Sequence, residues 1–194
     1  CFNKGQIKAT YGTGAFILLN TGEKPYYSKN GLLSTIASAY NNEITYALEG
    51  SIFVCGAAIE WLRDDLNLLD DPKNLGEIIK NSTDNDIYFV PAFVGLGTPY
   101  WDNEVRGTFL GLKRRTSKAD LIKASLRAIT FEVEDVLKVL KKETKLNFSE
   151  LSTDGGVAKC EYILQEQANI SNIRVNQSSE PEITALGAGY IAGL

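Results

Sequence analysis

The chain has 194 residues, of which 44% are hydrophobic and 23% are charged, and 20 Lys and Arg against 24 Asp and Glu leave a formal net charge of −4. This length allows a substantial core in one large domain or two small ones, whereas the acidic balance argues against a nucleic-acid-binding surface, which needs a basic face. With 3 widely spaced Cys and 0 His, neither a disulfide framework nor a zinc site is indicated, and Ser-His and Cys-His nucleophilic pairs are excluded within the chain.

The first quarter of the chain predicts an antiparallel sheet. Residues 9–20 alternate in polarity and are rich in β-branched and aromatic residues, as a hairpin around Gly12–Gly14 would be. Two more strands are predicted at 31–39 and 43–48, joined by an Asn-Asn turn.

The turn at Gly12, Thr13 and Gly14 is a candidate phosphate site. Glycine lets a backbone approach a ligand closely, and the N–H groups of such a turn could hold a phosphate together with the Thr13 hydroxyl. A plain hairpin turn without a ligand explains the same three residues, and a single glycine motif does not decide between them.

The middle of the chain predicts helices separated by short strands. We expect a helix over 51–66, a short helix over 71–80 that begins at Pro72, a strand at 87–90, an ordered aromatic loop at 94–106, and a strand at 108–112. The clearest helix is predicted over 117–142, with Ser117 as its cap and Asp120 in its first turn.

The last quarter repeats the strand–turn–helix order. A strand at 151–153 runs into Asp154, Gly155 and Gly156, and it is followed by a helix at 159–169, a strand at 173–175 and a helix at 181–194. The small residues of this final helix suit close packing on a neighbour. Asp154 is expected to be structural, with its carboxylate accepting N–H bonds from the loop.

The order of elements indicates the fold class. A strand meander followed by helices that alternate with short strands suits an α/β protein with a mixed sheet flanked by helices. This order matches the ribonuclease-H-like layout of actin-like ATPases, and we expect residues 1–194 to form a single domain. The two glycine turns suggest that a nucleotide is held from two sides.

Hydrophobic runs, cysteine usage and the two ends of the chain give expectations about the cellular location and about the full-length protein. No apolar run approaches the roughly 18 residues of a membrane span, no signal-peptide pattern opens the chain, and free thiols suit a reducing cytosol. We therefore expect a cytoplasmic protein with no membrane partner. The chain starts without Met and stops inside a helical pattern, which suggests an internal piece of a longer protein.

Several blocks together resemble the glycerol kinases of the carbohydrate kinase family. They are residues 10–16 (TYGTGAF), 20–24 (NTGEK), 30–37 (NGLLSTIA), 46–53 (YALEGSIF), 56–64 (GAAIEWLRD), 90–93 (VPAF), 95–97 (GLG), 99–102 (PYWD), 106–107 (RG), 154–156 (DGG) and 184–188 (TALGA). The blocks come in the order typical of that family and cover nearly the whole chain, as most of its C-terminal domain.

The resemblance implies ATP-dependent phosphorylation of glycerol to glycerol 3-phosphate, with this chain on the ATP/ADP side of the cleft. The catalytic base, the Mg²⁺ ligands and most glycerol contacts would belong to an N-terminal domain absent here. We therefore expect no catalytic and no metal-ligating residue in this chain, an inactive isolated chain, and a homo-oligomer for the full-length protein.

Individual roles are carried over from the matching positions. Nucleotide contacts are implied for Gly12, Thr13, Gly14, Gly56, Glu60, Gly155, Gly156 and Cys160, and a contact with the glycerol carbons for Phe16. Thr13 would touch the transferring phosphate, and Gly156 the ribose and α-phosphate side. Close helix packing explains Gly56 equally well, and a hydrophobic strand position is compatible with the role of Phe16.

Two positions depart from the pattern. Where the family often has Gln near the adenine this chain has Glu60, and where it often has Asn it has Cys160. An amide donates and accepts, whereas a carboxylate only accepts and a thiol does both weakly. We therefore expect loose selectivity for the nucleotide base, with the phosphate contacts unaffected.

Two alternatives stay open. One is a kinase of the same family for another sugar or polyol, because most substrate contacts would lie outside this chain. The other is a non-catalytic, actin-like nucleotide-binding module, which Glu60 and Cys160 favour. A Gly-Asp-Gln-Gln stretch just upstream of Cys1 would discriminate between enzyme and binding module.

Overall fold

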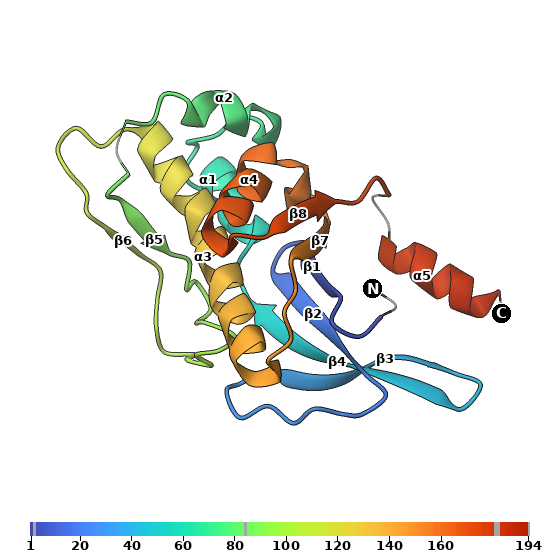
Figure 1. Ribbon diagram of the computed structural model, residues 1–194. Helices are drawn as coiled ribbons and strands as arrows, with labels where there is room; N and C mark the ends of the chain where they lie inside the picture. Colours follow the sequence, from blue (N-terminus) through green and yellow to red (C-terminus); the bar gives the residue numbers. More distant parts are fainter. Residues whose placement is uncertain (2, 84, 181–182, 194) are drawn as a thin grey trace.

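The predicted meander forms four strands of a six-stranded mixed sheet in the computed structural model, which describes all residues except 2, 84, 181–182 and 194 (Figure 1). The strands are β1 (Ile7–Tyr11), β2 (Ala15–Gly22), β3 (Leu33–Tyr40), β4 (Glu43–Ile52), β7 (Glu150–Asp154) and β8 (Arg174–Gln177), in the order β3-β4-β2-β1-β7-β8. The first four pair antiparallel, and β7 and β8 join them in parallel. The expected α/β fold is confirmed.

The helices follow the predicted order along the chain. They are α1 (Gly56–Asp64), α2 (Leu75–Ile79), α3 (Lys118–Thr144), α4 (Glu161–Ser171) and α5 (Ile183–Ala192), with 3-10 turns η1 (Pro72–Asn74) and η2 (Val157–Lys159) and a separate strand pair β5 (Tyr88–Val90) and β6 (Thr108–Leu110). Ser117 caps α3 as predicted, because its side chain accepts from Asp120 N while the Asp120 carboxylate accepts from Ser117 N.

The core lies between one face of the sheet and α1, α3 and α4. Alternate residues of β1 are buried in it, and so is the apolar stripe of α3. Its largest fully buried side chains are Tyr11, Ile7, Ile17, Leu19, Leu48, Ile52, Leu62, Leu69, Ile122, Leu126, Ile129 and Leu137. This packing fixes the edge of the sheet at which β1 and β7 both end.

The helix predicted over 51–66 begins later than expected. Ser51 and Ile52 still belong to β4, and α1 starts only at Gly56. Ser51 is held by tertiary partners: its N–H donates to Thr98 Oγ1 at 3.0 Å, and its carbonyl accepts from Thr98 N at 2.8 Å. These bonds to a distant loop satisfy the backbone as strand, and they override the local helical spacing.

The final helix lies apart from the core. The prediction covered 181–194, of which 181–182 and 194 fall outside the described residues, and the rest contains α5 with no buried residue (Figure 1). Across the described part of the chain, no helix is long and apolar enough to cross a membrane.

Candidate functional site

The two glycine turns meet because of strand pairing. β1 and β7 run parallel, with Thr10 opposite Asp154, so the turn after each strand leaves the sheet at the same edge. Loops at the carboxyl ends of neighbouring strands are where open α/β sheets bind their ligands. Residues far apart in the sequence are thereby brought to one place, as the prediction of a two-sided site requires.

The first turn is anchored by backbone bonds to the start of α1. The N–H of Cys55 donates to Thr13 O at 2.8 Å, that of Gly56 to Gly12 O at 2.9 Å and that of Ala57 to Thr13 O at 3.1 Å. The first amides of α1 are therefore already used by the turn. Within the described part of the chain the Thr13 hydroxyl makes no hydrogen bond, and it remains available to a ligand.

Gly56 has a structural reason to be glycine. A Cβ at this position would lie 2.6 Å from Gly12 O, a distance that real Cβ atoms do not tolerate. Gly56 therefore permits the close approach of α1 to the turn. It also lines the pocket described below, so the geometry is compatible with both close helix packing and a nucleotide contact at Gly56.

The second turn divides its two glycines by role. Gly155 has a φ of +94°, and a Cβ there would collide with Tyr11 O, so the backbone itself requires glycine. Gly156 has a φ of −63° and nothing within 4 Å of where its Cβ would be. Packing in this structure gives no reason for glycine at 156, whereas a ligand seated against the turn would.

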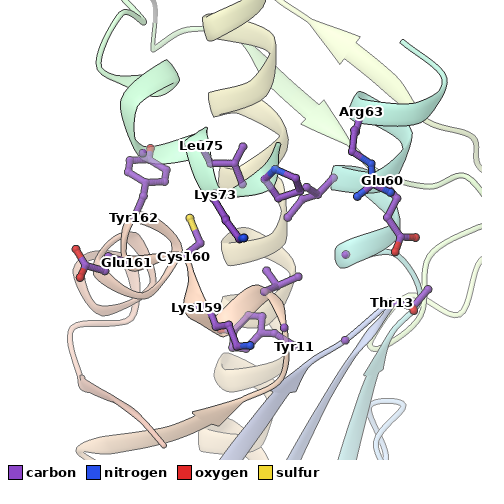
Figure 2. Close-up of a pocket in the computed structure, with 17 residues that line it drawn as sticks. Tyr11, Thr13, Glu60, Arg63, Lys73, Leu75, Lys159, Cys160, Glu161 and Tyr162 are labelled. Atoms are coloured by element: carbon purple, nitrogen blue, oxygen red, sulfur yellow. The ribbon is translucent and has the colours of Figure 1, made fainter. Parts of the chain in front are cut away.

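A cavity of about 710 Å³ opens beside both turns (Figure 2). It is lined by Tyr11, Gly12, Thr13, Gly56, Ile59, Glu60, Arg63, Pro72, Lys73, Leu75, Gly76, Gly156, Val157, Lys159, Cys160, Glu161 and Tyr162. Its volume lies within the range of small-molecule sites. The sheet edge, α1, the η1–α2 segment and the η2–α4 segment each supply part of the wall.

The structure brings six of the predicted nucleotide contacts to this cavity, namely Gly12, Thr13, Gly56, Glu60, Gly156 and Cys160. Gly14 and Gly155 are not part of the lining, and each allows a close backbone approach, Gly14 to Ile52 O and Gly155 to Tyr11 O. Phe16 lies on β2, is 47% exposed and is outside the cavity lining.

The two unusual positions face the cavity from different walls. Glu60 projects from α1, and Cys160 lies at the start of α4 on the other side (Figure 2). Glu60 is exposed at the rim, close in this view to Thr13, whereas Cys160 is half-buried and free. Among the described residues, neither the Glu60 carboxylate nor the Cys160 thiol has a hydrogen-bond or ion-pair partner.

Asp154 differs from its predicted role. Its carboxylate accepts no loop N–H bond but pairs with Lys8 Nζ at 2.8 Å, across the β1–β7 boundary. The side chain is 3% exposed, and Oδ1 has no hydrogen-bond partner among the described residues. The parallel pairing of the two strands places Lys8 there, which the residues of the loop alone did not indicate.

Several lining residues were not predicted from the sequence. Lys73, Leu75 and Pro72 come from a segment with no motif, and only the tertiary fold brings it to the cavity. Lys159 lies three residues after Gly156, which was a usable signal. Burial, and to a smaller extent the nearby Glu166 carboxylate, raises the pKa of Tyr162 to about 12. This phenol is neutral at physiological pH.

The described residues contain no cluster of metal-binding side chains. No three His, Cys, Asp or Glu side chains there are placed to hold a metal ion. Around the cavity the acidic residues are Glu60 and Glu161, which come from α1 and α4 and do not converge.

Comparison with known proteins gives one consistent family. The sequence pattern of the FGGY family of carbohydrate kinases, C-terminal domain, matches residues 7–194. The chain is 50% identical over its whole length to glycerol kinases of Lactococcus lactis and Enterococcus casseliflavus, and it spans 39% and 38% of their lengths.

Solved structures agree with this result. A glycerol kinase of Plasmodium falciparum with ADP superposes with a TM-score of 0.90 at 36% identity, over 99% of this chain and 38% of that one. A ligand-bound xylulose kinase of Lactobacillus acidophilus gives a TM-score of 0.83 at 24% identity, over 97% of this chain and 38% of that one. The latter likeness concerns the fold alone.

Proposed function

This chain belongs to the FGGY family of carbohydrate kinases, and on that premise we propose that it forms the nucleotide side of a kinase that phosphorylates glycerol with ATP. The chain spans about two fifths of the glycerol kinases that it resembles. The activity proposed is therefore that of a full-length protein, with glycerol 3-phosphate and ADP as products.

One observation carries the proposal: Thr13 and Gly156, from turns far apart in sequence, face the same cavity. A free hydroxyl on one side and a turn open to close approach on the other suit a polyphosphate chain. Phosphoryl transfer is mostly positioning and charge neutralisation. The chain's part in the reaction is to hold the nucleotide so that the transferring phosphate lies at Thr13.

The remaining chemistry is assigned to residues outside this chain. The described residues offer no metal-binding cluster, the sequence has 0 His, and the only carboxylates in the cavity lining of the described residues are Glu60 and Glu161. We therefore propose that the Mg²⁺ ligands and the catalytic base belong to another domain. The isolated 194-residue chain should accordingly bind nucleotide without transferring phosphate.

Glycerol is the acceptor that the comparisons favour. Relatives at about half identity over the whole chain are glycerol kinases, whereas xylulose and gluconate kinases share the fold at lower identity. Phe16, exposed on β2 next to the Thr13 turn, would cover the carbon chain of the acceptor. An apolar ring suits the CH groups of a small polyol and leaves its hydroxyls to other donors.

The test is ATP-dependent glycerol 3-phosphate formation by the full-length protein, with xylulose and gluconate as competing acceptors. We expect kcat/KM for glycerol to exceed that for the two sugars by several hundredfold, equivalent to more than about 3 kcal/mol. Preference for a sugar would favour the other-polyol alternative. ADP binding without transfer to any acceptor would favour the non-catalytic module.

A further inference from the structure

Lys159 is held at the sheet end of the cavity. It is the last residue of η2, the short turn that follows Gly156. Its N–H donates to Gly156 O at 3.3 Å, and Cys160 N donates to Val157 O at 3.0 Å. The segment is therefore a fixed link between the double-glycine turn and α4. In Figure 2 the Lys159 side chain extends from this link on the side of the cavity nearest the sheet.

The Lys159 ammonium group has no protein partner in the described part of the chain. No hydrogen bond or ion pair holds it, whereas Lys8 pairs with Asp154 at 2.8 Å and Arg63 pairs with Asp64 at 2.6 Å. A lysine that lines a cavity without a carboxylate partner is a ready contact for an anion, since its charge sits on a flexible stem that can follow the ligand.

We propose that Lys159 binds the diphosphate of the nucleotide. This assignment rests on the proposed function, because it takes the nucleotide to run from Thr13 past Gly156. Lys159 follows Gly156 by three residues and lines the same cavity. Its ammonium group would neutralise phosphate charge where the diphosphate of the nucleotide passes the second turn. Lys binds phosphate as a point charge in many proteins.

A neighbouring carboxylate does not remove this charge. Lys159 also lines a smaller cavity of about 260 Å³ whose lining includes the carboxylates of Asp154 and Glu180, and among the described residues neither of them forms an ion pair with Lys159. The Asp154 carboxylate is already neutralised by Lys8, so it offers Lys159 little competing attraction. Lys159 therefore stands between two cavities with its charge available to the larger one.

Lys73 provides a matched control within the same cavity. It also has no ion-pair partner among the described residues, and it enters from the η1 segment beside Pro72 and Leu75, on the wall away from the sheet (Figure 2). Besides Lys73, that wall consists of Pro72, Leu75 and Gly76, whose apolar groups suit a base better than a phosphate. Loss of the Lys73 charge should therefore change the affinities for ligands with and without phosphates by the same factor.

The experiment compares ADP and adenosine binding to the full-length protein by calorimetry. We expect Lys159→Met to weaken ADP binding about tenfold and to leave adenosine binding unchanged, because one charge-assisted phosphate contact is lost. Lys159→Arg should keep most of the ADP affinity. Lys73→Met should change both affinities by the same factor. The ADP affinity of Lys159→Met should also depend less on salt.

Two results would overturn the proposal. One is an equal change in ADP and adenosine affinity for Lys159→Met, and the other is no change at all, with thermal unfolding showing that the variant is folded. Lys159→Gln serves as a second neutral variant if the first is unstable. A wild-type protein that binds no ADP would overturn the proposed function as well, whereas a wild-type kinase with a normal Lys159→Met variant would overturn this assignment alone.

Discussion

The backbone N–H of Cys55 donates to the carbonyl oxygen of Thr13 across 2.8 Å. This bond, with those of the next two amides, joins the start of α1 to the turn that we assign to the transferring phosphate. The turn is thus positioned by a helix that is itself packed in the core. Changes at this junction should affect nucleotide handling through geometry rather than through lost ligand contacts.

Gly56→Ala tests the junction directly. The new Cβ would lie 2.6 Å from Gly12 O, so the turn must move, and overpacking of this kind costs roughly 1–3 kcal/mol. We expect a lower melting temperature and a lower kcat. Gly76→Ala is the control for stability, because nothing lies within 4 Å of its Cβ position. Unchanged melting and kinetics for Gly56→Ala would contradict the tight junction.

Thr13→Ala should lower kcat more than it weakens ADP binding. The hydroxyl is proposed to touch the transferring group, and loss of one such donor costs on the order of a hundredfold in rate. The ADP dissociation constant should change by less than about threefold, since the backbone grip persists. Thr13→Ser should restore most of the rate. Equal losses in rate and ADP affinity would place Thr13 away from the transferred phosphate.

Substitutions at the two adjacent glycines should separate folding from binding. Gly156→Val should weaken ATP and ADP binding at least tenfold, which corresponds to about 1.4 kcal/mol. The melting temperature should not fall, because the Cβ position of Gly156 is open. Gly155→Val should instead impair folding, since its φ is +94° and Tyr11 O blocks the space. Unchanged affinities for Gly156→Val would refute the two-sided site.

Glu60 should influence the choice of base. A carboxylate at the rim can accept from an amino group but cannot donate to a ring nitrogen, so we expect other purine triphosphates to be used within about tenfold of ATP, or roughly 1.4 kcal/mol. Glu60→Gln should then shift the preference toward ATP. The measurement is kcat/KM for ATP, GTP and ITP in both proteins, and an unchanged ratio would remove Glu60 from the site.

Glu132 on α3 should make stability depend on pH. Burial, and then the like charge of Asp135, raise its pKa to about 8. Because the folded state holds this proton more tightly than the unfolded chain does, the free energy of unfolding should fall as pH rises from about 5 to 8, by up to about 1.4 kcal/mol per pH unit.

Glu132→Gln removes that titration and provides the check. The variant should gain stability relative to the wild type as pH rises through this range, and the difference should level off above about pH 8. Denaturant unfolding at pH 5, 6, 7 and 8 measures it. Parallel stability curves for the two proteins would show that Glu132 does not titrate in this window.

Local chemistry in the sequence determined much of the secondary structure. Ser117 and Asp120 specify the start of α3 by a capping box, and Asn41 and Asn42 adopt the positive φ values that a tight hairpin turn requires. The two glycine turns were also recognisable, because their conformational needs are local. These features predicted the α/β class and the lining residues that belong to the turns, Gly12, Thr13 and Gly156, whereas Gly56, Glu60 and Cys160 came from the family resemblance and the other lining residues were not predicted.

Only the tertiary structure decided how these pieces meet. The parallel pairing of β1 with β7 sets Thr10 against Asp154, and so brings the turns together and pairs Lys8 with Asp154. Ser51 is strand because Thr98 bonds its backbone, and Lys73 reaches the cavity although its segment carries no motif. Such contacts depend on residues far apart in the chain, and local propensity and periodicity do not encode them.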